Sequence, residues 1–182
     1  MPYTELLRVT VLVLGAAATA LAAVTIFAAD ADDDTTTLIV AAGWWAIAIA
    51  VGMYLGRPER AGESIRGALA GAKTSPLLPT ANPGRIAIGR LWPLAAFALV
   101  AGVVGIFLPP VAAVGTGYGL LTALAWRSRE AIVTAVEERD GVRFYVESAS
   151  AFEEVRLIRT PGLSRDRAPA GHPPPPPPIA GD

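Results

Sequence analysis

The chain has 182 residues, of which 53% are hydrophobic and only 17% are charged, with a formal net charge of −1. Soluble domains carry about 25% charged residues, so this composition favours an integral membrane protein. The absence of cysteine excludes disulfides, thiolate metal sites, cysteine nucleophiles and palmitoylation. Abundant Ala, Gly and Pro, with Arg in place of almost every Lys, indicate a bacterial genome rich in G and C.

Two uncharged apolar segments near the start of the chain, about 9–29 and 37–56, predict the first two membrane spans. The acidic loop Asp30–Asp34 separates them, and we interpret it as solvated, because it lacks the glycine and bidentate glutamate of a calcium loop. The alternative for the first span is a cleaved signal peptide, since Ala29-Asp30-Ala31 has the small-x-small form. Its apolar run, however, exceeds the roughly 7–15 residues of a signal peptide.

The third uncharged stretch, 91–126, would be about 54 Å long as one helix, too long for a single crossing. Pro109-Pro110 interrupts it, and proline removes a backbone donor and clashes with the preceding turn. We therefore predict two spans, 88–108 and 111–126, joined by a tight turn. One long kinked or re-entrant segment is the alternative.

The loops predict the orientation in the membrane. The loop 57–87 is basic, and Arg127 and Arg129 follow the fourth span, whereas the first loop has no basic residue. Basic residues mark the cytoplasmic side. We therefore expect a multi-pass protein of the cell (inner) membrane with both termini in the cytoplasm. Within the loop four apolar residues share one helical face, which predicts either a helix on the inner leaflet or a mobile loop: Ile65, Ala68, Leu69 and Ala72.

Small residues four positions apart recur in the predicted spans and let helix backbones approach closely in lipid. The glycines predicted to pack helices together are Gly52, Gly56, Gly102, Gly105, Gly115 and Gly119. The stretch from Gly115 to Gly119, Gly-Thr-Gly-Tyr-Gly, resembles the selectivity filter of potassium channels. A filter needs a membrane-crossing inner helix after it. Here Arg127 follows too soon, so we interpret these glycines as close-packing positions.

The segment 127–160 has the pattern of a soluble unit. Residues 128–139 form an amphipathic helix that ends at Gly141, and apolar residues alternate through 142–146, with a second strand expected at 155–158. This unit is too small to be stable alone, so its apolar residues must make an internal or intermolecular contact. The residues predicted for this contact are Ile132, Val136, Phe144, Val146, Val155 and Leu157.

The sequence thus predicts an all-α integral membrane protein. Its four transmembrane helices lie within 1–126, a small cytoplasmic helix plus β-hairpin within 127–160, and a disordered Pro-rich tail within 161–182. Apart from Arg90, which is expected to snorkel to the interface, no ionisable residue lies within a span, and His172 is the only histidine.

We therefore predict no catalytic, metal-binding or cofactor-binding residue, no enzymatic activity and no nucleic-acid partner. The expected function is that of an accessory, scaffold or interaction component that uses its cytoplasmic segment. Its expected partners are the lipid bilayer and another membrane or cytoplasmic protein, or a second copy of the chain. The alternative is a subunit of an oligomeric transporter or channel.

Overall fold

The computed structural model of the chain describes residues 1–59, 62, 65, 67, 69, 71–74, 83–146 and 157–161. The predictions for Ala68, for Val155 and for the tail beyond 161 lie outside these residues. Over the described residues the chain is mostly helical, and its elements in order are α1 (Tyr3–Ala31), α2 (Thr35–Leu55), β1 (Lys73–Thr74), α4 (Pro83–Phe107), α5 (Pro109–Trp126), α6 (Arg129–Asp140), β2 (Val142–Val146) and β3 (Leu157–Pro161).

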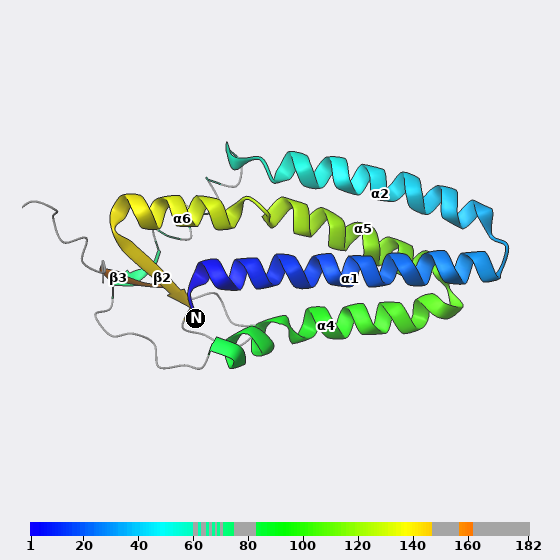
Figure 1. Ribbon diagram of the computed structural model, residues 1–182, viewed down its shortest axis with the longest axis horizontal. Coiled ribbons are helices and arrows are strands. Elements are labelled where there is room, and N and C mark those ends of the chain that lie inside the picture. The colour runs from blue at the N-terminus through cyan, green and yellow to red at the C-terminus, as the bar shows by residue number, and fades with distance from the viewer. Residues whose placement is uncertain are drawn as a thin grey trace, which may run out of the picture.

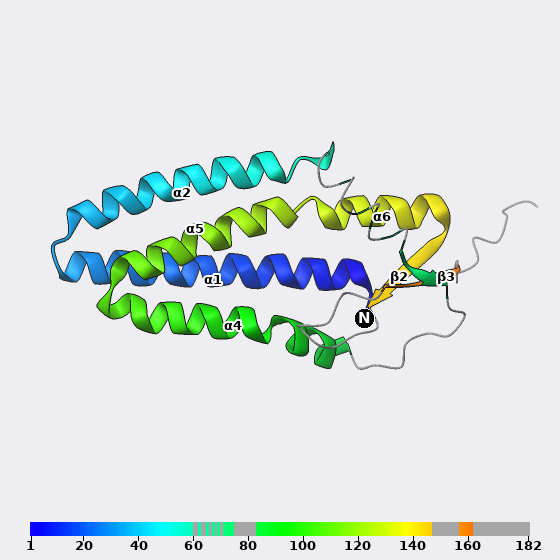
Figure 2. The same ribbon diagram turned by 180° about the vertical axis from the view of Figure 1, so that it is seen from behind.

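The four long helices lie side by side, and α6 and the strands gather at one end of them (Figure 1). Helix α5 packs against α1, α2 and α4, and α1 packs against α5, α4, α6 and β2. Both views place α2 and α4 on opposite flanks of the α1–α5 pair (Figure 2). Helix α1 is therefore a central element, and cleavage at its end would remove the helix on which α4, α5, α6 and β2 pack.

Local sequence explains where the helices begin and end. The side chain of Asp34 caps α2 by accepting a hydrogen bond from the backbone N–H of Thr37 at 3.0 Å. Pro109 and Pro110 occupy the first two positions of α5, where a proline costs no hydrogen bond, and Leu108 alone separates α4 from α5. The uncharged stretch 91–126 thus forms two helices that meet at a tight turn.

The surface of the helical bundle is apolar. Within the described part of the chain, three helices are long and apolar enough to cross a membrane: α1, α2 and residues 84–107 of α4. Helix α5, with 18 residues, is not among them. Phe27 and Phe107 expose 75% and 79% of their surface. Many aliphatic side chains of the bundle helices are also exposed, with smaller exposed fractions. Such a continuous exposed apolar surface is typical of helices that face lipid.

A three-stranded sheet, with strand order β1-β3-β2, lies beyond the end of the bundle. Strands β2 and β3 are antiparallel, with Val146 opposite Leu157 and Val142 opposite Pro161, and β1 runs parallel to β3. The sequence predicts only a two-stranded hairpin, so β1, from the loop between α2 and α4, is an addition. We call α6 and the three strands the head.

The largest core cluster lies where the head meets the bundle. It joins the first turns of α1 and α4 to α6, β2 and β3, together with two residues of the loop after α2. Its buried members, which we call the head–bundle core, are Met1, Leu6, Leu7, Ile65, Leu69, Ile86, Val133, Val142, Phe144, Val146 and Leu157.

Candidate functional site

The predicted contact residues of the C-terminal unit that the structure describes, all of the set except Val155, face inward. Phe144, Val146 and Leu157 are buried in the head–bundle core, and Ile132 and Val136 are partly buried against it. Alternation along β2 explains the arrangement, because residues two apart share one face of a strand. The sequence left open whether these residues make a contact within the chain or with another chain. The structure places the described members of the set in a contact within the chain.

Three residues on the opposite side of this contact were not recognised from the sequence, and Val133, which the sequence places on the apolar side of the helix, was left out of the predicted contact set. Leu6 and Leu7 lie in the first turns of α1, Ile86 lies in the first turn of α4, and Val133 of α6 is a fully buried member of the same core. Leu6, Leu7 and Ile86 directly precede predicted spans. An apolar residue in such a position is usually interpreted as part of the membrane segment rather than as part of a soluble core. The apolar face of α6 includes Val133, which is the one signal that could have identified it.

The apolar residues of the loop after α2 also belong to this core. Ile65 and Leu69 are buried in it, and Ala72 packs against it. The sequence predicted either a helix on the inner leaflet or a mobile loop for this face. The structure instead uses the face to cover the head.

Polar contacts close the outer edge of β2. The backbone N–H of Phe144 donates to Oε1 of Glu137 at 2.9 Å, and the backbone N–H of Val146 donates to the carbonyl of Met1 at 3.0 Å. An unpaired strand edge would be a place for another chain to add a strand. In this head that edge is already bonded to α6 and to the start of the chain.

Five of the six predicted packing glycines lie against a neighbouring helix at close range. A Cβ on Gly52 or Gly56 would collide with the backbone of α5, and one on Gly105 would lie 2.5 Å from the Cβ of Ala112. A Cβ on Gly115 or Gly119 would lie 3.0 Å from a side-chain carbon of α1. At Gly102 the contact would be an ordinary one of 3.7 Å.

The stretch that resembles a potassium-channel filter is regular helix within α5. Its middle glycine, Gly117, supports the indole of Trp44, which occupies the space that a Cβ would need. The Trp44 ring also meets the ring of Tyr118 edge-on, with centroids 5.7 Å apart. The stretch therefore packs α5 against α1 through Gly115 and Gly119 and against α2 through Gly117.

Two tryptophans attach α2 to α5. The indole N–H of Trp45 donates to the carbonyl of Ala113 at 2.9 Å, and that of Trp44 donates to the carbonyl of Val114 at 3.4 Å. From the sequence alone these residues do not fit an interfacial aromatic belt, because they lie inside the second span. The hydrogen bonds explain them, since an indole N–H in an apolar setting needs an acceptor.

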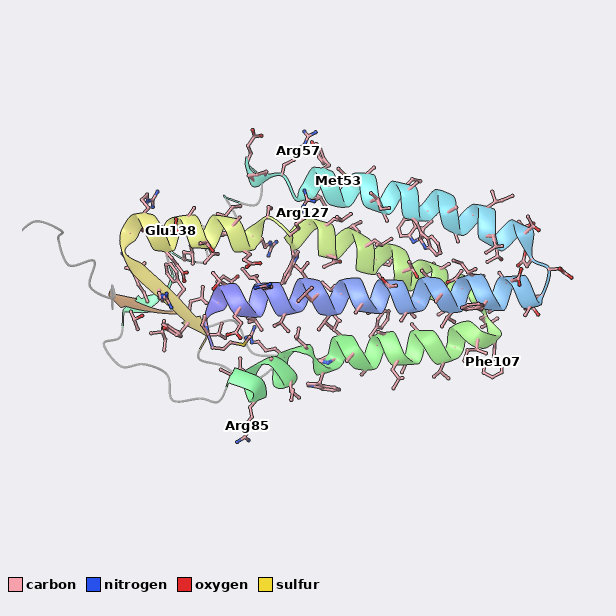
Figure 3. All side chains as sticks on the ribbon, in the orientation of Figure 1. Met53, Arg57, Arg85, Phe107, Arg127 and Glu138 are labelled. Carbon is pink, nitrogen blue, oxygen red and sulfur yellow. The ribbon has the colours of Figure 1, made fainter. Side chains whose placement is uncertain are left out.

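Three arginines and the acidic turn between α1 and α2 lie at opposite ends of the bundle. Arg57, Arg85 and Arg127 lie at the end that carries the head, and Phe107 lies at the opposite end (Figure 3). The acidic turn between α1 and α2 is also at that opposite end (Figure 1). There, hydrogen bonds from Thr37 hold the pKa of the Asp34 carboxyl below its usual value. Among the described residues, no three His, Cys, Asp or Glu side chains group as they would around a metal ion.

An apolar groove lies between α2 and α5 near the acidic turn. Its volume is about 240 Å³, and its walls are Val40, Ala41, Trp44, Pro110, Ala113 and Val114, with Thr36 and Thr37 at one edge. It contains no ionisable side chain among these lining residues, so it offers shape and apolar contact rather than acid–base chemistry.

In comparisons with protein-family models, with curated proteins and with solved structures, nothing matches this chain.

Proposed function

We propose that the chain is a four-span protein of the bacterial inner membrane that acts as an accessory or scaffold component and presents its head to another protein in the cytoplasm. One observation carries the proposal: the head and the bundle share a single core, in which Val133 and Phe144 pack with Leu7 and Ile86. A head attached in this way has a fixed orientation relative to the helices. Such an orientation suits a docking platform better than a tethered domain.

The proposed topology places both termini in the cytoplasm. Three helices meet the length and apolarity needed for a span, and α5 returns the chain from the turn at Leu108 to the end with the head. The clustering of Arg57, Arg85 and Arg127 at that end agrees with the preference of basic residues for the cytoplasmic side. The acidic turn and the turn at Leu108 would then face outward.

The partner surface in this proposal is the polar outside of the head rather than its apolar residues. Phe144, Val146 and Leu157 are already covered within the chain, and their role would be to hold the head in place. Glu138 on α6 and Arg143 on β2 are exposed. Exposed charges set the specificity and rate of association more than its affinity, which suits a reversible contact.

Site-specific photo-crosslinking in native membranes tests the proposal. A photoreactive amino acid in place of Glu138 or Arg143 is expected to give a discrete crosslinked protein, and one in place of Phe107, at the other end of the bundle, is not. The change Arg143→Glu should remove the product obtained at position 138. Arg57→Glu, an equal charge reversal at the same end of the bundle but outside the head, should leave it.

Two results would overturn the proposal. One is the absence of a crosslinked protein from both head positions. The other is movement of ions or solutes by the purified chain in liposomes, which would favour the alternative of a transporter or channel subunit.

A further inference from the structure

The apolar groove between α2 and α5 opens to the outside of the bundle. Two of its lining residues, Val40 and Val114, expose 65% and 49% of their surface, whereas Ala41 and Ala113, which also line it, are buried. Val40 belongs to one of the helices that are long and apolar enough to cross a membrane. The groove therefore faces lipid hydrocarbon, and its apolar lining fits an acyl chain better than a polar solute.

The length of the groove matches a single leaflet of a bilayer. Its lining residues on α2 extend from Thr36 to Trp44, roughly 12 Å along the helix axis. The hydrocarbon core of a bilayer is about 30 Å thick, so each leaflet contributes about 15 Å. On α5 the lining begins at Pro110, the second residue of that helix, so the groove starts at the end of the bundle. This extent fits one acyl chain of one leaflet.

The end of the bundle at which the groove starts is acidic. Asp32 and Asp33 are exposed in the turn before α2. The carboxylate of Asp34 accepts hydrogen bonds from the backbone N–H and the hydroxyl of Thr37, which lines the groove. The same hydrogen bonds lower the pKa of Asp34, so its carboxyl is ionised at neutral pH. No basic residue occurs within 9–56 or 91–126, so neither segment supplies a positive charge to offset this turn.

This charge selects the headgroup of a lipid whose chain lies in the groove. The headgroup lies beyond the outer end of the acyl chain, at the level of the acidic turn. An ammonium group there would donate its N–H groups to the carboxylates, which form charge-assisted hydrogen bonds. A headgroup whose only charge is a phosphate would instead be repelled. The groove and the turn together favour a lipid with an ammonium headgroup.

We propose that the groove holds an acyl chain of a phospholipid with a primary ammonium headgroup, and that Asp32, Asp33 and Asp34 accept hydrogen bonds from the ammonium. The site goes beyond the docking role, because it uses the lipid-facing side of α2 and α5 and no residue of the head. It rests on insertion of the bundle in the membrane, but not on which side of the membrane the head faces.

Native mass spectrometry of the full-length chain tests the site. The chain is purified in detergent, delipidated, and incubated with phosphatidylethanolamine or phosphatidylglycerol that carry the same acyl chains. We expect about threefold more phosphatidylethanolamine to be retained, because an exposed charge pair contributes only modestly to binding. The preference should shrink as the salt concentration rises. Equal retention of the two lipids, or a preference for phosphatidylglycerol, would overturn the proposal.

Removal of charge from the turn tests the role of the carboxylates. Asp32→Asn together with Asp33→Asn should abolish the preference for phosphatidylethanolamine. The double variant keeps Asp34 as the cap of α2, and asparagine adopts the left-handed conformation of residue 33, whose φ is 52°. Glu5→Gln together with Glu138→Gln, which removes two charges at the end with the head, is the matched control and should keep the preference. An equal loss in both double variants would reduce the effect to net charge and overturn the proposal.

A larger side chain in the groove tests where the acyl chain lies. Val40→Trp adds an indole to the lining and should reduce the retention of phosphatidylethanolamine. Ile39→Trp is the control, because Ile39 precedes Val40 on α2 and exposes 68% of its surface, but is not one of the residues that line the groove. Equal retention in the two variants would show that the groove does not hold the lipid.

Cysteine accessibility separates a failure of this site from a failure of the topology. If Leu108→Cys and Glu138→Cys label from opposite sides of the membrane, but the purified chain does not prefer phosphatidylethanolamine, the lipid site is wrong and the topology stands.

Discussion

At the scale of single residues, the clearest feature is the space that Gly117 leaves for Trp44. The indole lies where a Cβ on residue 117 would be, and its N–H reaches the carbonyl of Val114 three residues earlier on α5. A glycine is therefore required here because a large side chain approaches the backbone closely. The backbone of residue 117 has ordinary helical angles, so they do not require a glycine.

The change Gly117→Ala is expected to destabilise the chain by about 1–3 kcal/mol, because the indole must shift and overpacking in a close-packed interior costs that much. Unfolding of the purified chain in detergent measures this. Gly43→Ala, next to Trp44 on α2, is the matched control, since a Cβ there meets nothing within 4 Å. Equal stability of the two variants would contradict the packing role of Gly117.

The N-cap of α2 predicts a pH-dependent effect. Hydrogen bonds from Thr37 lower the pKa of Asp34 in the folded chain, so the contribution of Asp34 to stability is present above its unfolded pKa of about 3.9. It is lost as the pH falls through the lower folded value. Asp34→Ala should therefore lower the thermal unfolding midpoint at pH 7, and the difference from the unaltered chain should shrink near pH 2.

Asp32→Ala serves as the comparison, because Asp32 is an exposed residue of the same turn that caps no helix with its side chain. A deficit of Asp34→Ala that stays constant from pH 7 to pH 2 would show that the carboxylate does not act as the cap.

Single residues differed in how far the sequence revealed them. Glycine spacing identified positions such as Gly52 and Gly119, because close helix packing needs small residues at a fixed interval. Gly117 was likewise predicted as a close-packing position, but its partner could not be predicted, because Trp44 lies 73 positions earlier in the chain. The Oγ of Ser128 and the Nε of Arg129 are buried without a hydrogen-bond partner, and no sequence pattern predicts this, because only the packed structure buries them.

At the scale of elements, α2 depends on α5 for most of its packing. Its buried residues Ala41, Ala48 and Gly52 share the face that carries Trp45, and this face lies against α5. The two indole hydrogen bonds act at the middle of this contact. Helix α2 is thus held in the bundle mainly through this one contact.

Replacing both indoles, as Trp44→Phe and Trp45→Phe together, should weaken this contact by roughly 1 kcal/mol per hydrogen bond lost, or somewhat less in lipid. The chain has no cysteine, so Ala48→Cys reports directly on the buried face of α2. We expect faster maleimide labelling of Cys at position 48 in the double variant. Ile47→Cys, on the exposed face, is the control and should label at the same rate with and without the two indoles. An unchanged labelling rate at position 48 would show that the indole hydrogen bonds do not hold α2 against α5.

The turn between α6 and β2 depends on Gly141, whose φ of 62° lies in the left-handed region. Gly141→Ala should destabilise the head by roughly 1–2 kcal/mol, since a Cβ in this conformation is crowded by the backbone. Gly141→Asn should cost less, because asparagine adopts this conformation more readily. Hydrogen exchange of the β2 amides measures the effect, and equal protection in both variants would contradict it.

The sequence predicted the ends of helices where a proline or a glycine has a specific role at that end. Pro109-Pro110 predicted the turn before α5, and Gly141 predicted the end of α6. Strand β1 could not be predicted, because Lys73 and Thr74 form a strand only through their pairing with Ile158 and Arg159. The second strand of the expected hairpin, placed at 155–158, is described as β3 at 157–161, since the loose segment before it does not fix the register.

At the scale of the whole molecule, the head and the bundle are joined by one core. The amphipathic pattern of α6 and the alternation of β2 predicted that the small unit must rest on something. They could not say on what, because Leu6, Leu7 and Ile86 are ordinary apolar residues at the edges of apolar segments. The structure supplies that answer, and it moves the proposed partner surface to the outside of the head.

The topology is the central claim of this account, and single-cysteine accessibility in intact cells tests it most directly. A membrane-impermeant maleimide should label Asp32→Cys and Leu108→Cys, in the two turns at one end of the bundle, without permeabilisation. Arg57→Cys and Glu138→Cys, at the end with the head, should label only after the membrane is opened. Labelling of positions 108 and 138 from the same side would contradict four spans with a cytoplasmic head.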